Sequence, residues 1–137
     1  MKRSSIILTL LFLILCLSSC KNREKVVKQP NDNDIKVAQL VIDAATQREL
    51  GNLEKATSLY KEVIRFQPNN SLAYYQLAAI DFESRNIASA IEYNQKAIEL
   101  SPKNHWYRTQ LAEIYLLTNQ IDKAAEQYKE IIELQPN

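Results

Sequence analysis

The stretches IRFQP at 64–68, IELSP at 98–102 and IELQP at 132–136 repeat one phrase along this 137-residue sequence. The prolines that close them are 34 residues apart each time. Three further series keep the same interval: Ala44, Ala78 and Ala112; Ala56, Ala90 and Ala124; Val63, Ala97 and Ile131. A fixed period of this length indicates a structural repeat, with units at 37–70, 71–104 and 105–137.

Each unit has the pattern of two helices. Spacings of three and four residues, as in Ala124, Tyr128 and Ile131, place apolar side chains on one helical face. Midway through each unit the sequence reads Gly51-Asn52, Arg85-Asn86 or Asn119-Gln120, and glycine and asparagine tolerate the left-handed conformation that ends a helix. One glycine and four prolines leave little material for tight sheet turns or a Gly-rich phosphate loop, so we predict an all-α fold.

The period and its content resemble the tetratricopeptide repeat (TPR) family. That family has large residues at repeat positions 4 and 7, small residues at 8 and 20, aromatics at 11 and 24, and proline at 32. The third unit matches with Leu111, Ala112, Tyr115, Ala124, Tyr128, Ile131 and Pro136. The resemblance implies a short right-handed superhelix of three helix-turn-helix repeats. The departures are Asp43, Gln47, Asp81, Asn94 and Arg108, and an irregular first helix is expected of a terminal repeat.

In this family the first helices of the repeats line a concave groove, and the resemblance places mostly apolar residues there. Our candidate partner-binding residues are Val41, Tyr75, Phe82, Trp106 and Leu116. Tyrosine and tryptophan are favoured interface anchors, and an amphipathic helix or extended peptide would fit such a groove. The alternative is that Phe82, Leu116 and Leu117 complete the core around the irregular positions.

One family mechanism is excluded by the residues present. TPR domains that clamp a carboxylate use lysine, arginine and asparagine at set groove positions. Here those positions hold Val41, Ala45, Gln76, Trp106 and Gln110. We therefore expect no carboxylate clamp.

The N-terminus has the pattern of an export signal. Lys2 and Arg3 precede an apolar run of 12 residues at 6–17, which is too short to span a bilayer. Leu17-Ser18-Ser19-Cys20 then resembles a bacterial lipobox, whereas bulky Leu15 argues against Cys16. The resemblance implies a cleaved signal peptide at 1–19 and diacylglyceryl and N-acyl groups, such as palmitate, on Cys20. An ordinary cleaved signal and an uncleaved anchor are the alternatives.

Residues 20–36 follow as the lipidated cysteine and a polar, flexible linker. Its lysines and arginine could also touch anionic lipid head groups. Lys21 after the cysteine favours the outer membrane over the inner, with the helical domain in the periplasm.

The charges exclude some classes of function. Seventeen basic and 16 acidic residues nearly cancel, and removing Lys2 and Arg3 leaves a net charge of −1, so we expect no nucleic-acid partner. His105 is the only histidine, and no nucleophile or metal-ligand cluster accompanies it. We expect no metal, no cofactor besides the lipid, and no enzymatic activity.

These observations predict a lipid-anchored adaptor that binds another envelope protein or peptide. A structural assembly factor, similar to pilotins or outer-membrane assembly components, is the alternative, and glycan binding is a weaker one. Ile132 and Leu134 correspond to Ile98 and Leu100, which should pack on a following repeat. We expect a second copy, a partner or further sequence to cover this end, so the chain is a candidate homo-oligomer.

Overall fold

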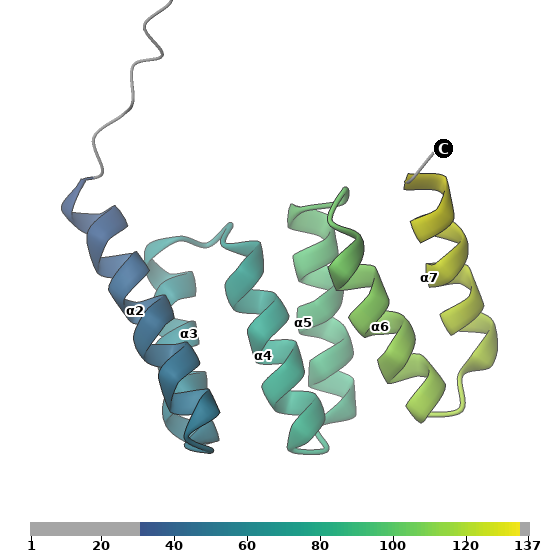
Figure 1. Cartoon of the computed structure of the whole chain (residues 1–137), viewed down its shortest axis with the longest axis horizontal. Coiled ribbons are helices and arrows are strands. Elements are labelled where there is room, and N and C mark those ends of the chain that lie inside the picture. The colour runs from purple at the N-terminus through teal and green to yellow at the C-terminus, as the bar shows by residue number, and fades with distance from the viewer. Residues whose placement is uncertain (1–30, 135–137) are drawn as a thin grey trace, which may run out of the picture.

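The computed structural model describes residues 31–134, which fold into six α-helices. Figure 1 shows the helices side by side in a row. They pack as the pairs α2–α3, α4–α5 and α6–α7, which confirms the predicted all-α fold of three helix-turn-helix repeats. The helices are α2 (Asp32–Glu49), α3 (Leu53–Phe66), α4 (Ser71–Glu83), α5 (Ile87–Leu100), α6 (His105–Leu117) and α7 (Ile121–Leu134).

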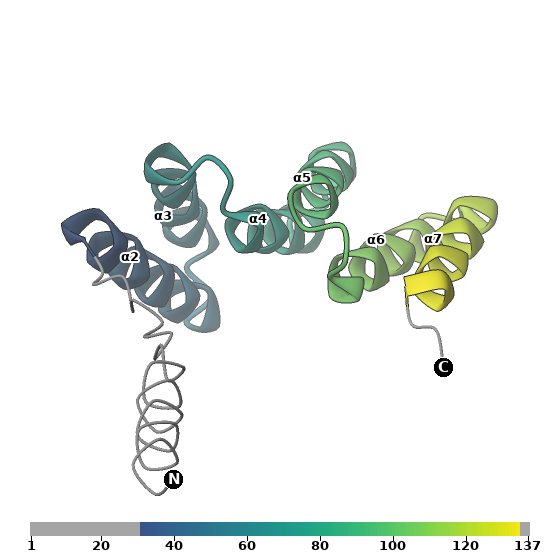
Figure 2. The ribbon, with the colours of Figure 1, turned by 90° about the horizontal axis from the view of Figure 1, so that it is seen from above.

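The helices form two layers. Seen from above, α2, α4 and α6 form one layer, and α3 and α5 lie behind it (Figure 2). Each second helix packs on the first helix of the next repeat, since α3 contacts α4 and α5 contacts α6. The first helices therefore share one face of the molecule.

The turn inside each repeat has one backbone form. Its central residue adopts positive φ: 77° at Gly51, 64° at Arg85 and 61° at Asn119. In each case the next N–H reaches back across the helix end, as from Asn52 N to Gln47 O at 2.9 Å. The prediction is confirmed at Gly51 and Asn119. In the middle repeat Arg85, rather than Asn86, takes the left-handed conformation.

The first helix begins earlier than the sequence predicted. The linker was expected to run to residue 36, but α2 begins at Asp32. Asn31 caps it: its side chain accepts from Asp34 N at 2.9 Å, and the Asp34 carboxylate accepts from Asn31 N at 3.2 Å. Val37 in the second turn is buried, which ties this start to the core. The rest of the linker, the signal peptide at 1–19 and Cys20 lie outside the described residues.

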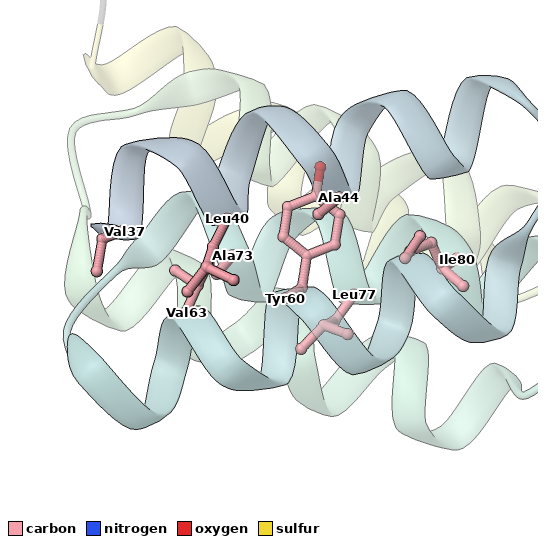
Figure 3. Packing of buried hydrophobic residues seen from close by; sticks show 9 residues of the cluster. Val37, Leu40, Ala44, Tyr60, Val63, Ala73, Leu77 and Ile80 are labelled. Atoms are coloured by element: carbon pink, nitrogen blue, oxygen red, sulfur yellow. The ribbon is translucent and has the colours of Figure 1, made fainter. Parts of the chain in front are cut away.

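The core of the first two repeats combines small and large side chains (Figure 3). Ala44 and Ala56 are fully buried where α2 meets α3, and Tyr60 and Leu77 fill the space beside them. A second cluster in the third repeat joins Leu111, Ala112, Tyr115 and Ala124. The alanines predicted at repeat positions 8 and 20 thus let the paired helices approach closely.

Within residues 31–134, every helix falls short of the length and apolar character that crossing a bilayer requires.

Candidate functional site

The face shared by α2, α4 and α6 carries the predicted contact residues. We call it the first-helix face; the predicted residues on it are Val41, Tyr75, Phe82, Trp106 and Leu116. In α6, helical spacing puts Trp106, Glu113 and Leu117 on the side opposite buried Leu111. This side of α6 is therefore exposed to solvent and free to meet a partner.

Aromatic residues gather near the start of α4 and α6. Trp106 is 63% exposed in the first turn of α6. Tyr75 is half-buried, and its ring lies 5.0 Å from the ring of buried Tyr107. The Tyr107 hydroxyl is 3.2 Å from Ser71 Oγ, so its ring is held between two repeats. Tyr75 thus rests on a fixed support, and Trp106 precedes Tyr107 in the first turn of α6 with its own side chain exposed.

An ion pair crosses the same face near the helix ends. Arg48 of α2 pairs with Glu83 of α4 and also donates from Nη1 to Gln76 Oε1 at 2.9 Å. The Arg48 side chain is 27% exposed, so the pair is only partly open to solvent. It fixes the first repeat against the second and neutralises one acidic group.

Apolar residues flank this ion pair. Leu116 is 42% exposed and Leu117 is 73% exposed. Leu117 and half-buried Phe82 line a hollow of about 400 Å³ with Glu83, Arg85, Ile87 and Thr118. Leu116 and Leu117 are too exposed to complete the core, which removes that alternative for these two residues.

Val41 has a different environment from the other candidates. It is partly buried and packs against the core cluster of the first two repeats. Any contact with a partner would be made by its remaining exposed edge.

The remaining charge of this face is negative. Glu49 at the end of α2 and Glu113 in α6 are both exposed, and neither forms an ion pair with another described residue. Since Glu83 already pairs with Arg48, this face offers two free carboxylates, against one free guanidinium, that of exposed Arg85 in the hollow.

Two polar contacts inside the fold were missed by sequence reasoning. Fully buried Asn94 of α5 donates to Gln110 of α6. Arg108 of α6 pairs with Glu130 of α7, Nη2 to Oε2, at 2.8 Å. The repeat pattern itself contained a signal for these contacts. Asn94 stands where the other repeats have Tyr60 and Tyr128, and Arg108 stands where they have Leu40 and Tyr74.

The described residues contain no group of three or more His, Cys, Asp or Glu side chains that could hold a metal ion. His105 packs against the next residue of α6: the centre of its ring lies 4.9 Å from the centre of the Trp106 ring.

The geometry defines a helical-repeat protein with a polar and aromatic face suited to binding. Residues 81–137 match a sequence model described as "Tetratricopeptide repeat" (TPR_19). This match covers α5, α6 and α7, and the three helix pairs of the described chain have the same helix-turn-helix form, so the chain contains tetratricopeptide repeats. No curated protein sequence matches it significantly.

Several solved structures share the fold. MamA is 26% identical with a TM-score of 0.66, over 73% of this chain and 58% of that one. A double mutant of MamA RS-1 is 22% identical with a TM-score of 0.67, over 72% and 55%. The first TPR of Spaghetti (RPAP3), bound to the HSP90 peptide SRMEEVD, is 19% identical with a TM-score of 0.68, over 74% and 81%. The chain spans a little over half the length of the two MamA chains.

Proposed function

We propose that this protein is a binding module whose first-helix face holds an apolar, basic segment of another envelope protein. The observation that carries the proposal is that Trp106 is 63% exposed next in sequence to buried Tyr107, whose ring supports Tyr75. A large aromatic side chain on a rigid support loses little conformational entropy on binding, which is why such residues dominate interface energetics.

The charges indicate the chemistry of the segment. Glu49 and Glu113 would repel an acidic peptide and attract lysine or arginine. The RPAP3 structures hold the peptide SRMEEVD, which ends in acidic residues and a carboxylate. This chain has Val41, Ala45 and Gln76 at positions where a carboxylate clamp has lysine and asparagine. We therefore propose the same face as a binding surface with the opposite charge preference.

Replacing the exposed anchor tests this proposal. We expect Trp106→Ala in the full-length protein to weaken partner binding about 30-fold, the effect of losing an aromatic hot spot. The fold should survive, because Trp106 is 63% exposed. The measurement is crosslinking and pull-down from native cells, quantified by mass spectrometry. Lys61→Ala, an exposed site on α3, is the matched control and should recover the same partners as the unmodified chain.

Equal recovery by Trp106→Ala and the unmodified chain would contradict binding at this face. Charge reversal at Glu49 and Glu113 tests the ligand chemistry separately. Partners that are lost with Trp106→Ala but unaffected by these reversals would contradict the proposed basic character of the segment.

We also propose that Cys20 anchors the protein in a membrane through its lipid groups, with the outer membrane favoured. The support is the order of Leu17, Ser18, Ser19 and Cys20 after a short apolar run. Two or three acyl chains hold a protein on a bilayer stably, whereas one does not. A tether of this kind raises the effective concentration of the module near envelope partners, so modest affinity suffices.

Removing the thiol tests the anchor. We expect Cys20→Ala to move the protein from the membrane fraction to the soluble fraction, or to leave the uncleaved precursor. Cys16→Ala is the matched control and should stay with the membrane, because Leu15 precedes it. The mass of the mature chain provides the second readout. An unlipidated mature chain in the Cys16→Ala control would contradict the proposal.

A further inference from the structure

The two ends of the helical row are finished differently. Each second helix has a stripe at the same four repeat positions, and the next repeat covers it in α3 and α5. All residues of these two stripes are buried or partly buried. They are Leu53, Thr57, Tyr60 and Ile64 in α3, and Ile87, Ile91, Asn94 and Ile98 in α5. The same positions in α7 are Ile121, Ala125, Tyr128 and Ile132, and all four are exposed.

We call these four residues the α7 stripe. Ile121 is 55% exposed, Tyr128 39% and Ile132 73%. Tyr60, at the position of Tyr128 in the first repeat, is 1% exposed. No described element covers the α7 stripe, so α7 presents to solvent a face that its two counterparts bury.

The opposite end of the row has polar residues at the positions where the other first helices contact a preceding repeat. The later first helices pack against the preceding repeat through residues that are all buried. These are Ala73, Leu77 and Ile80 in α4, and Tyr107, Leu111 and Ile114 in α6. In α2 these positions are Gln39, Asp43 and Thr46, and all three are exposed. Gln39 Nε2 donates to Asp43 Oδ1 at 2.9 Å, so the polar groups satisfy one another. Ile35 and Ile42, 57% and 59% exposed, lie on the same side of α2, so this end is mixed in polarity whereas the α7 stripe is apolar.

The α7 stripe is complementary to itself. It ends in Ile121 and Ile132 and has small Ala125 near its centre, which permits close approach of a second helix. Asp122 and Lys129, seven residues apart, lie on the same flank of the stripe. In an antiparallel pair related by a two-fold axis, the same flanks meet, so Asp122 of each copy comes beside Lys129 of its partner.

We propose that the α7 stripe is the interface for a second copy of this chain, packed antiparallel about a two-fold axis. Ile121 meets the partner's Ile132, and Ala125 meets the partner's Tyr128. The two Asp122–Lys129 pairs fix the register, as flanking charges do in paired helices. This surface lies outside the predicted contact residues of the first-helix face, so the inference does not depend on the proposed function.

Crosslinking of the full-length protein in membranes tests the pairing. A short thiol-reactive crosslinker should give a homodimer from Ala125→Cys. Glu126→Cys is the matched control: Glu126 is also exposed but points to the polar side of α7, so we expect at least tenfold less homodimer. The unmodified chain controls for Cys16 and Cys20. Equal homodimer yields from Ala125→Cys and Glu126→Cys, or no homodimer from Ala125→Cys, would overturn the proposal.

Charge exchange distinguishes a second copy from another partner. In the Ala125→Cys background we expect Asp122→Lys or Lys129→Asp to lower the homodimer yield about tenfold, because like charges then face each other. The double exchange Asp122→Lys/Lys129→Asp should restore it, because both pairs are remade in the opposite sense. A product of Ala125→Cys with a different protein, or no restoration in the double exchange, would overturn the two-fold pairing. All three positions are exposed, so these variants should fold.

Discussion

Tyr60→Ala should lower the free energy of unfolding by about 3–5 kcal/mol, the usual cost of removing a large buried aromatic side chain. Tyr60 is 1% exposed and packs with Ala44, Val63 and Leu77, so it joins α2, α3 and α4. A domain of this size has only about 5–15 kcal/mol in total, so the variant should lose a large share of its stability and unfold at a clearly lower urea concentration. Urea titration followed by circular dichroism measures the change.

Lys61→Ala is the matched control, because Lys61 follows Tyr60 in α3 and is exposed. It should cost about 1 kcal/mol or less. Equal losses at the two positions would show that burial between repeats is not the cause. Tyr60→Phe should keep most of the stability, since the ring remains.

The same tyrosine gives a pH signature. Burial raises the pKa of Tyr60, the nearby Arg48 lowers it, and Glu49 adds a smaller rise. The unfolded chain releases this proton near pH 10 while the folded chain retains it, so stability falls as pH rises past about 10. Tyr60→Phe should reduce this fall, because phenylalanine has no proton to release.

Glu130→Ala should destabilise the third repeat by about 2 kcal/mol, because it leaves the Arg108 guanidinium unpaired. The Arg108 side chain is 11% exposed and its Nη2 lies 2.8 Å from Glu130 Oε2. Arg108→Leu should be neutral or stabilising instead. The substitution inserts leucine, the residue that the first repeat has at this position as Leu40. The Glu130 carboxylate that it leaves without a partner belongs to a side chain that is 42% exposed, so water can solvate it.

The comparison of these two variants separates charge from packing. Glu133→Ala, at an exposed site in the same helix, should leave stability unchanged within about 0.5 kcal/mol. If Arg108→Leu were more damaging than Glu130→Ala, the ion pair itself would be the stabilising element. Thermal unfolding at a single protein concentration provides the measurement.

The repeat architecture was accessible from sequence because it rests on local rules. Alanines at a 34-residue interval predicted the close helix contacts, and Ala44, Ala78 and Ala112 are indeed fully buried. The start of α2 was missed because Asn31 and Asp34 form a capping box inside a polar stretch that reads as linker. Arg85 in the left-handed conformation was missed because the turn geometry common to all repeats overrides its preference.

The candidate site was predicted only in part. Trp106 and Tyr75 were identified, but the sequence could not tell that Tyr75 rests on buried Tyr107 or that Arg48 reaches Gln76 and Glu83. These contacts join residues about 30 positions apart, and a 34-residue period says which positions correspond but not which side chains touch.

The sequence by itself determined the period, the helix pairs and the positions of the small core residues, because each depends on spacing within one or two helices. The tertiary structure alone decided which apolar positions are covered. Ile64, Ile98 and Ile132 have the same residue and the same repeat position, yet only Ile132 is widely exposed, at 73%. Burial of a helix face depends on the neighbour placed against it, and within the described chain α7 is the second helix that has none.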